Sequence, residues 1–461
     1  MNLKQNSARP AEATITKHPS DGLRAVRLAQ PGTAPRSPVL PARLWYRAVF
    51  IAVILFSLTR CVENAGAQSV LANGANQAGT LLANTTNSYT LTANAGDNIV
   101  LRLGTVGFLG NLNLYGPTGA FLKTAASGTD AELAYTATNS GTFTVYVSSY
   151  AAGGSGTYVL RLAQFPEAFI VPAGDEGGPM TNGGNYAGTN SLGDLDMWSF
   201  TANAGDNIVL RLGTVGFLGN LSLYGPNGAL LKTVASGMDA EVDYTATNSG
   251  TFTALVSSYS VGGTGTYVLY LAQFPEPFIV PAGDQGGSMN GSSNYVGAIA
   301  LGDLDIWSFT ACVGNAINLE LKTTNFNGNL RLYGSNGALL KTAASGTDAV
   351  LNYTATNCGT FTLLVSSYSP GGSGTYGLAA NGLSEELKLC PPVISGTNLN
   401  LCGIGGQSSA RFVLYTTTNI ATPSGLWTPI YTNLFDQFGM FNYTNLYNPA
   451  VSQKYFRFLV P

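Results

Sequence analysis

Paired carboxylates are the residues of this sequence whose spacing could support catalysis. Asp130 and Glu132 lie two positions apart, Asp239 and Glu241 repeat the pair, and Asp348 stands alone at the third corresponding place. Two carboxyl groups at a fixed separation are the machinery of a glycosidase. Acids that recur with a repeat are more typical of surface charges, and no insertion in the repeats would form a pocket around them. We therefore expect no enzymatic activity.

Histidine chemistry is excluded by composition. The chain of 461 residues has a single histidine, His18, in an N-terminal segment that we expect to be removed. The remainder would then lack the imidazole of Ser-His-Asp and Cys-His catalysis, of histidine-ligated zinc and of proton shuttles. Beyond residue 67 the chain holds 12 basic and 21 acidic residues, so no basic stripe is available and nucleic-acid binding is not expected.

The four cysteines beyond residue 67 predict disulfides. Cys312 and Cys358 occur in only one copy of a repeated segment, which suggests a bridge between neighbouring strand ends. Cys390 and Cys402 would close a small loop. Four cysteines allow three pairings, and we favour Cys312–Cys358 with Cys390–Cys402. A redox or metal site is the alternative, but the sequence has neither a CxxC motif nor a histidine to support it.

Residues 1–67 have the features of a signal peptide with an extended n-region. Ala48–Leu58 is an uncharged apolar run of 11 residues, shorter than the roughly 20 residues of a membrane span but suited to an h-region. Ala65–Ala67 supplies a small-x-small cleavage motif. The sequence predicts a protein that is secreted, or held at the cell surface, with no membrane span after cleavage near Ala67. An uncleaved anchor and lipidation at Cys61 are the alternatives.

A segment of 109 residues occurs three times without insertion or deletion. Thr92–Leu112 recurs unchanged as Thr201–Leu221, and the third copy begins at Thr310. A period this long is a whole domain, because solenoid repeats run about 20–50 residues. The predicted repeats are residues 68–165, 166–274 and 275–384.

Each copy predicts β structure. Asn98–Leu103 alternates, with Ile99, Leu101 and Leu103 on one face, and Gly-rich turns separate some eight such segments. Proline-containing linkers, Phe165–Pro172 and Phe274–Pro281, should be extended and stiff. Further strands are expected in residues 391–461 at Phe412–Tyr415, Trp427–Ile430 and Tyr455–Phe458. The predicted fold class is all-β: three tandem jelly-roll-like β-sandwich domains plus a small C-terminal β-sandwich module.

An ordered set of motifs carries a family resemblance. Gly193–Phe200 (GDLDMWSF) leads into Thr-Ala-x-Ala-Gly-Asp, then Leu-Tyr-Gly-Pro-Asn-Gly, Tyr-Thr-Ala-Thr-x-Ser-Gly-Thr-Phe and Gly-Thr-Tyr-Val-Leu. Over about residues 70–382 this resembles the bacterial pre-peptidase C-terminal domain, which is similar to the collagen-binding domains of clostridial collagenases. The resemblance implies a jelly-roll-like sandwich, secretion and an accessory role beside a peptidase. No peptidase is present in this chain.

The resemblance also implies calcium as a cofactor. Some collagen-binding relatives hold calcium with acids of the preceding linker and aspartates just before a Tyr-Ser-Phe strand. The matching positions are Asp175, Glu176, Asp194 and Asp196 in the second copy and Asp284, Asp303 and Asp305 in the third. Calcium takes six to eight oxygen ligands, which clustered carboxylates and carbonyls can supply. Residues 84–87 of the first copy lack acids. The alternative is that these aspartates cap turns in solvent.

Relatives also bind collagen with exposed tyrosines. One such position, before a Gly-rich loop, is occupied by Tyr150, Tyr259 and Tyr368. A second family tyrosine is Ser148, Ser257 and Ser366 here, a departure that puts collagen as the ligand in doubt. Ordinary cross-strand packing is the alternative for the tyrosines.

Two functions fit these observations, and they differ in the aromatics they need. The first is a secreted, non-catalytic protein that binds an extracellular polymer (a polysaccharide or a fibrous protein) or the cell envelope, with three copies raising avidity. The second is a structural spacer or rod of the cell surface or matrix. An accessory subunit of a secreted peptidase is a third possibility. A binder should expose a repeated aromatic patch, whereas a spacer should present polar faces only.

Overall fold

The computed structural model describes residues 69–461 apart from positions 127, 236, 290, 292, 345, 384–387, 407–408, 437–438, 447, 452 and 461. The expected signal peptide, its cleavage site near Ala67 and the lipidation alternative at Cys61 lie outside these residues. Within the described part of the chain, no helix is long and apolar enough to cross a membrane.

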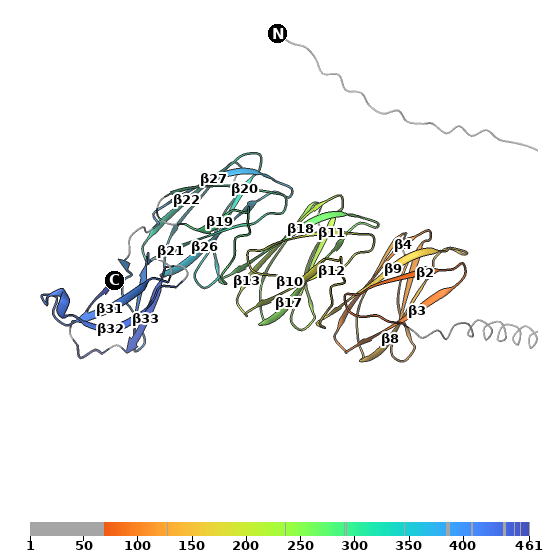
Figure 1. Cartoon of the computed structure of the whole chain (residues 1–461), viewed down its shortest axis with the longest axis horizontal. Coiled ribbons are helices and arrows are strands. Elements are labelled where there is room, and N and C mark those ends of the chain that lie inside the picture. The colour runs from red at the N-terminus through yellow and green to blue at the C-terminus, as the bar shows by residue number, and fades with distance from the viewer. Residues whose placement is uncertain are drawn as a thin grey trace, which may run out of the picture. The chain divides into compact units, whose positions relative to one another are not determined.

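The predicted all-β fold is confirmed. The described residues of each repeat form a five-stranded and a four-stranded sheet, with largely antiparallel pairing (Figure 1). In the first repeat the five-stranded sheet has the order β1(Ser69–Val70)-β3(Thr86–Ala93)-β8(Gly141–Ser149)-β5(Gly110–Tyr115)-β6(Phe121–Ala126). Its four-stranded sheet has the order β2(Asn76–Leu81)-β9(Gly156–Phe165)-β4(Asn98–Val106)-β7(Asp130–Thr136). In the second repeat the five-stranded sheet has the order β10(Gly177–Pro179)-β12(Asp196–Ala202)-β17(Gly250–Ser258)-β14(Gly219–Tyr224)-β15(Leu230–Ala235). Its four-stranded sheet has the order β11(Asn185–Asn190)-β18(Gly265–Phe274)-β13(Asn207–Val215)-β16(Asp239–Thr245). In the third repeat the five-stranded sheet has the order β19(Gly286–Ser288)-β21(Asp305–Ala311)-β26(Gly359–Ser367)-β23(Gly328–Tyr333)-β24(Leu339–Ala344). Its four-stranded sheet has the order β20(Ser293–Ile299)-β27(Gly374–Asn381)-β22(Ala316–Thr323)-β25(Asp348–Thr354).

The C-terminal module adds two small sheets. One is β28(Lys388–Leu389)-β30(Asn398–Ile404)-β29(Val393–Ser395), with β33(Phe441–Leu446) also paired to β30. The other is β32(Thr428–Leu434)-β31(Arg411–Thr417)-β34(Tyr455–Leu459). A short 3₁₀ turn, η1(Ser424–Leu426), precedes β32, so this strand begins after Trp427 and not at it. Phe412 is fully buried among the aromatic rings of Phe435 and Phe441 at the centre of the module.

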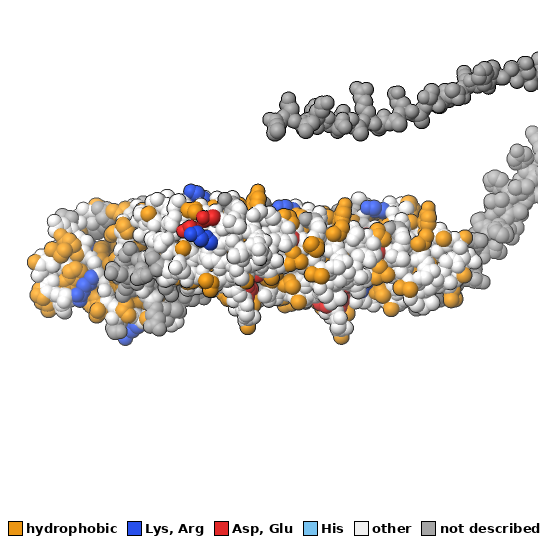
Figure 2. All heavy atoms as spheres, turned by 90° about the horizontal axis from the view of Figure 1, so that it is seen from above, with side chains coloured by type: hydrophobic (Ala, Val, Ile, Leu, Met, Phe, Trp, Pro, Cys, Tyr) orange, Lys and Arg blue, Asp and Glu red, His pale blue; other side chains and the backbone are white. Residues whose placement is uncertain are grey.

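Uncharged polar surface covers much of the molecule, in keeping with a charged fraction of only 10%. Figure 2 shows one face on which uncharged side chains and backbone predominate and charged side chains are sparse. The apolar residues instead fill the space between the two sheets of each repeat. On β4, for example, Ile99, Leu101 and Leu103 point into the core of the first repeat. Period-2 alternation thus identifies the core face of this strand correctly.

The other face of β4 is buried as well, because the second repeat covers it. Val100 packs with Leu195 and Met197 of the second repeat. Phe165, at the end of β9, stacks on Tyr224 with ring centroids 3.6 Å apart. The second junction repeats this arrangement, since Phe274 stacks on Tyr333 at 3.9 Å. Each junction is therefore a small apolar core of its own, which a single-repeat pattern does not reveal.

Buried ion pairs accompany these apolar contacts. Arg102 forms a two-pronged pair with Asp130, with nitrogen–oxygen distances of 2.8 and 2.7 Å, and Arg211 pairs with Asp239 at the same distances. The interpretation of these aspartates as surface charges is wrong, because both are buried where one repeat meets the next. Asp348 has an exposed side chain and fits the surface interpretation.

The third repeat departs from the other two on the corresponding face. Where β4 has Val100, Arg102 and Gly104, the aligned strand β22 has Asn318, Glu320 and Lys322. Lys322 and Glu320 pair at 2.9 Å near the surface, and the lysine side chain is largely exposed. The C-terminal module comes after this repeat and is joined to it by a disulfide between Cys312 and Cys390.

The disulfide differs from the predicted pairing of Cys312 with Cys358 and of Cys390 with Cys402. Sequence spacing placed each bridge inside one module. The fold instead brings the turn after β21, which carries Cys312, against the start of the C-terminal module, which carries Cys390. The predicted pairing is therefore wrong for both residues.

Gly193→Ala should destabilise the first junction more than Gly205→Ala does. Both glycines have a positive φ, 71° and 99°, so both variants strain the backbone. A Cβ at position 193 would also overlap the backbone nitrogen of Gly104 in the first repeat, whereas nothing lies within 4 Å at position 205. We expect calorimetry to show a free energy of unfolding lower by about 1–3 kcal/mol in G193A than in G205A. Equal losses would contradict the close approach of the two repeats.

Candidate functional site: tyrosine loops and acidic clusters

The three predicted tyrosines lie on the same exposed loop of their repeats. The side chains of Tyr150, Tyr259 and Tyr368 are 70%, 66% and 65% exposed, so the cross-strand packing alternative does not hold. Each backbone N–H is fixed by a carbonyl of the neighbouring loop. Tyr150 donates to Leu109 at 2.9 Å and Tyr259 donates to Leu218 at 2.8 Å. The rings therefore project from anchored backbone into solvent.

In the first two repeats the loop that anchors the tyrosine also exposes a leucine. Leu109 and Leu218 are both solvent-exposed, whereas the third repeat has Asn327 at this position. Sequence patterns alone did not identify these leucines. One feature of the sequence could have pointed to them. The segment that contains each leucine follows a predicted core strand and is identical in the two copies.

The preceding repeat holds the tyrosine loop of the second and third repeats. The N–H of Gly262 donates to Asp130 at 3.2 Å, and the N–H of Gly371 donates to Asp239 at 3.0 Å. Arg102 also donates to the carbonyl of Ser258, next to Tyr259, at 2.8 Å. The buried Arg–Asp pairs thus fix both a junction and the loop that presents a tyrosine.

The first acidic cluster is built on the turn between β11 and β12. Carboxylate oxygens of Asp175, Asp194 and Asp196 lie within 4.8 Å of one another. Asp194 accepts the N–H and the hydroxyl of Ser191 at 2.7 and 2.8 Å, which closes the turn. Glu176 is not part of this cluster, and its carboxylate accepts the N–H of Thr189 at 3.1 Å.

An arginine of the first repeat reaches into this first cluster. Arg161 lies 3.0 Å from Asp194 and donates to the carbonyls of Leu192 and Gly193 at 3.1 and 2.9 Å. Its guanidinium compensates part of the negative charge. Asp196 remains unusual, since burial and the charge of Asp194 raise its pKa to about 9. One oxygen of Asp196 accepts the hydroxyl of Tyr267, and the other has no hydrogen-bond partner among the described residues.

The second acidic cluster is formed by the corresponding three aspartates of the third repeat, but it has no counterpart of Arg161. Oxygens of Asp284, Asp303 and Asp305 lie within 4.8 Å of one another. Tyr270 stands at the position of Arg161 and hydrogen-bonds Asp303. Burial, with the charge of Asp284 as the next cause, raises the pKa of Asp303 to about 6.

Asp305 is the most constrained acid of the second cluster. Burial, followed by the charge of Asp303, raises its pKa to about 9. Tyr376 donates its hydroxyl to one oxygen at 2.6 Å, and the other oxygen is buried with no hydrogen-bond partner among the described residues. Such a group needs either a proton or a cation. The alternative that these aspartates stay in solvent is wrong for Asp194, Asp196, Asp303 and Asp305, all of which are buried.

The first repeat replaces the acids by neutral groups, as its sequence indicates. Asn87 stands where the later repeats have Asp196 and Asp305, and it donates to the hydroxyl of Tyr158 at 2.7 Å. Tyr89 shares a hydrogen bond of 2.6 Å with the same hydroxyl. A network of neutral groups thus takes the place of the buried carboxylate.

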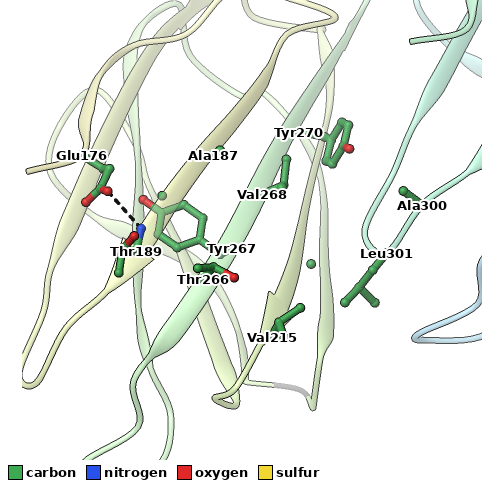
Figure 3. Close-up of a pocket in the computed structure, with 12 residues that line it drawn as sticks. Glu176, Ala187, Thr189, Val215, Thr266, Tyr267, Val268, Tyr270, Ala300 and Leu301 are labelled. Atoms are coloured by element: carbon green, nitrogen blue, oxygen red, sulfur yellow. Dashed lines mark hydrogen bonds between the residues drawn. The ribbon is translucent and has the colours of Figure 1, made fainter. Parts of the chain in front are cut away.

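A cavity of about 530 Å³ lies where the second repeat meets the third (Figure 3). Thr189, Val215 and Tyr270 line it from the second repeat, and Ala300 and Leu301 from the third. Another cavity, of about 500 Å³, shares Tyr270 and Ala300 with it and is lined by Asp284 and Asp303. The lining of the first is mainly apolar, whereas the second gives solvent a way to the acidic cluster.

A domain of known structure resembles part of this chain. One solved structure, the pre-peptidase C-terminal domain of a collagenase from Bacillus anthracis, matches 21% of this chain and 96% of its own length, with 19% identity and a TM-score of 0.20. The chain is similar to a pre-peptidase C-terminal domain. The resemblance inferred from the motifs is confirmed to that extent.

Longer matches are weaker. Tripeptidyl peptidase 2 is 10% identical over 86% of this chain and 36% of its own, with a TM-score of 0.17. An alpha-2-macroglobulin from Salmonella is 10% identical over 86% and 31%, with a TM-score of 0.12. No protein-family model and no curated protein matches the sequence.

Stability without divalent cations should fall with rising pH because of Asp305. The folded protein holds this proton up to about pH 9, whereas the unfolded chain releases it near 3.8, so the free energy of unfolding decreases between these values. Asp305→Asn keeps the shape and the buried oxygen but removes the titration. In EDTA, the thermal midpoint of D305N should depend less on pH than that of the wild type. Exposed Asp348→Asn is the control, and a D305N profile as steep as that of D348N would contradict the assignment.

Proposed function

We propose that this chain is an exported, non-catalytic protein that binds an extracellular polymer through its repeated tyrosine loops. The polymer is a polysaccharide, a fibrous protein or a component of the cell envelope. The observation that carries the proposal is the exposure of Tyr150, Tyr259 and Tyr368 at the same loop of each repeat. Tyrosine offers a large contact area with a polar end at low entropic cost, and so recurs at binding surfaces.

The tyrosine loops also have the order that a binding surface needs. Hydrogen bonds from Tyr150, Tyr259 and Tyr368 to the adjacent loop hold each backbone before any ligand arrives, which lowers the entropy lost on binding. Copies of one weak site on a single chain raise the overall affinity for a repetitive polymer. The absence of catalysis is supported by Asp130 and Asp239, whose carboxylates are occupied by arginine.

Loss of the three tyrosines should abolish retention on the bound polymer. The test is a pull-down of residues 68–461 on collagen, chitin, cellulose and the producer's envelope, comparing wild type with Y150A/Y259A/Y368A. We expect retention on one polymer to fall by at least about tenfold, because each binding step loses its aromatic contact. The matched control is F121A/L230A/L339A, which removes exposed apolar side chains at one other equivalent position of every repeat.

The spacer hypothesis predicts a different result from the same pull-down. Its supporting observation is that both repeat junctions are buried and built alike, with Phe165 on Tyr224 and Phe274 on Tyr333. A spacer needs no ligand, so no polymer should retain the wild type beyond the level of the triple tyrosine variant. That outcome would reject the binding proposal and leave a protein whose repeats set a distance.

We further propose that calcium binds at the second acidic cluster and not at the first. Asp284, Asp303 and Asp305 would hold it, and the cation would neutralise the buried carboxylates. The residues fit, because Asp305 has a buried oxygen without a partner and no guanidinium is paired with the cluster among the described residues. In the first cluster Arg161 already supplies a positive charge beside Asp194.

Calorimetric titration with CaCl₂ separates the two clusters. We expect the wild type and Asp196→Asn to bind calcium alike, and Asp305→Asn to lose binding, because only the second cluster lacks an internal cation. Calcium should raise the thermal midpoint of the wild type and of D196N but not of D305N. Loss of binding in D196N, or unchanged binding in D305N, would contradict this assignment.

A further inference from the structure

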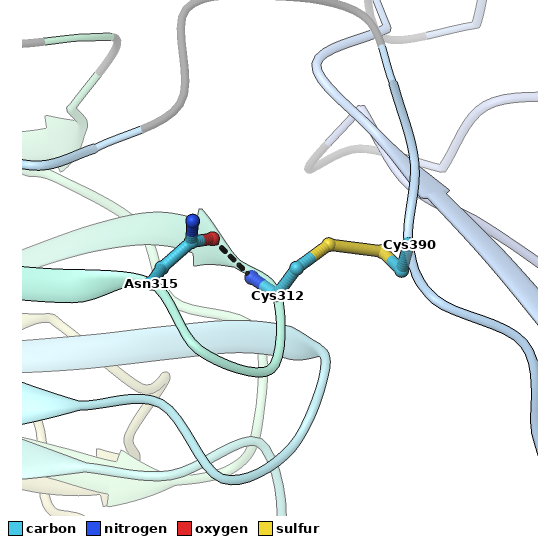
Figure 4. Close-up of a disulfide and its surroundings, with 3 residues drawn as sticks. All are labelled: Cys312, Asn315 and Cys390. Atoms are coloured by element: carbon cyan, nitrogen blue, oxygen red, sulfur yellow. Dashed lines mark hydrogen bonds between the residues drawn. A yellow bond between two sulfur atoms is a disulfide. The ribbon is translucent and has the colours of Figure 1, made fainter.

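The cysteines of the third repeat and the C-terminal module come together in one place. Cys312 lies in the turn after β21, Cys358 in the turn before β26, Cys390 just after β28 and Cys402 in β30. Figure 4 shows the disulfide that joins Cys312 to Cys390, whose Cα atoms are 5.7 Å apart. The sulfur of Cys358 lies within 4.8 Å of both sulfurs of this bond.

Cys358 and Cys402 are the remaining pair, and their thiols are in direct contact. The two side chains share a hydrogen bond, and burial with this contact raises the pKa of Cys402 to about 12. Both pack against the apolar Ile404 and Met440. The N–H of Cys390 donates to the carbonyl of Cys402 at 2.8 Å, so the two parts of the C-terminal module that carry cysteines are held together.

In the first two repeats, the residue at the position of Cys312 hydrogen-bonds to the linker that follows the repeat. Asn94, the counterpart of Cys312 in the first repeat, donates to Glu167 of the next linker at 3.1 Å. Asn203 in the second repeat donates to Glu276 at 2.9 Å. In the third repeat the same position fixes the next segment covalently through Cys390. The end of each repeat therefore tethers the adjoining C-terminal segment of the chain.

The position of Cys358 has a matching role. Its counterparts Ser140 and Ser249 accept the backbone N–H of Ala95 and Ala204, both at 2.9 Å, and so join two turns at the same end of the repeat. Cys358 sits at this end and faces Cys402 of the C-terminal module. Both turn positions that are polar in the first two repeats are thus cysteine where the neighbour is the module.

We propose that Cys358 and Cys402 form a second disulfide, so that two cross-links clamp the C-terminal module to the third repeat. The oxidant is a small or protein disulfide such as glutathione disulfide. One thiolate attacks it, forms a mixed disulfide and releases one glutathione thiolate. The second thiolate then attacks the cysteine sulfur and releases the other glutathione, so the cysteines lose two protons and two electrons and the oxidant becomes two thiols.

A zinc site is the other structure that four clustered cysteines could form. Zinc requires four thiolates, which need positive charge or hydrogen-bond donors around the sulfurs. Apolar side chains, Ile404 and Met440 among them, pack against the four cysteines. An apolar setting instead favours the neutral disulfide.

Peptide mapping of the full chain after refolding in a glutathione redox buffer tests the proposal independently of export and binding. Free thiols are alkylated, and the protein is digested with trypsin, which cuts after Lys322 and Arg331 between Cys312 and Cys358. Chymotrypsin cuts after Leu399, between Cys390 and Cys402. We expect the linked peptides Cys312–Cys390 and Cys358–Cys402, and no alkylation at any of the four cysteines.

Three results would overturn the second disulfide. These are alkylated Cys358 and Cys402, the crossed pairs Cys312–Cys358 and Cys390–Cys402, or four thiols released together with bound zinc. The variant C312S/C390S should still form the Cys358–Cys402 link, whereas C358S should leave Cys402 open to alkylation. The wild-type map decides the question even if a variant fails to fold.

Discussion

The buried pair of Arg102 with Asp130, repeated as Arg211 with Asp239, is the interaction on which the rest of the structure depends. Removing two charges from water is costly unless their hydrogen bonds are complete. Asp130 satisfies this demand with the guanidinium of Arg102 and the N–H of Gly262 from the next repeat. Docking of two repeats thus buries the pair and completes its hydrogen bonds at the same time. Docking of the repeats and placement of the tyrosine loop are consequently one event.

A shared backbone carries different electrostatics at the two junctions. Arg161 forms an ion pair with Asp194 at the first, whereas Tyr270 stands in its place at the second, where Asp303 has no direct ion pair in the described part of the chain. The second junction has an arginine elsewhere, since Arg331 pairs with Asp243 at 2.7 Å and Glu241 at 3.0 Å. One substitution within a repeated frame therefore removes an internal salt bridge, while the buried carboxyl groups Asp196 and Asp305 have a pKa raised to about 9 in both clusters.

Local patterns in the sequence predicted the strands well and the junctions poorly. The alternation in Asn98–Leu103 identified the core face, because two sheets of the same repeat bury it. It gave no sign that Arg102, on the opposite face, is buried, since nothing within one repeat indicates that another repeat covers that face. The cysteine pairing failed for the same reason, because the relevant neighbours are 78 residues apart and belong to different modules.

Family resemblance located the acids and tyrosines, and packing decided what each one does. Asp305 and Asp196 are buried at matching places, while Glu176 turns away to cap Thr189. The tyrosines were ambiguous between packing and exposure, because a ring before a Gly-rich loop suits either. Their exposure depends on how the loop is hydrogen-bonded to its neighbour, a long-range contact that sequence spacing does not show.

The substitutions on β22 determine how many repeats can be stacked. To dock a further repeat, the third repeat would need an arginine in place of Glu320 and a glycine in place of Lys322. The lysine side chain would occupy the place where, beside Gly104 and Gly213, the backbone of the following repeat approaches. Head-to-tail contacts that never close build filaments. A terminal unit with a charged outer face prevents this. The outer face of β22 therefore does not offer the contacts by which the first two repeats each dock the repeat that follows.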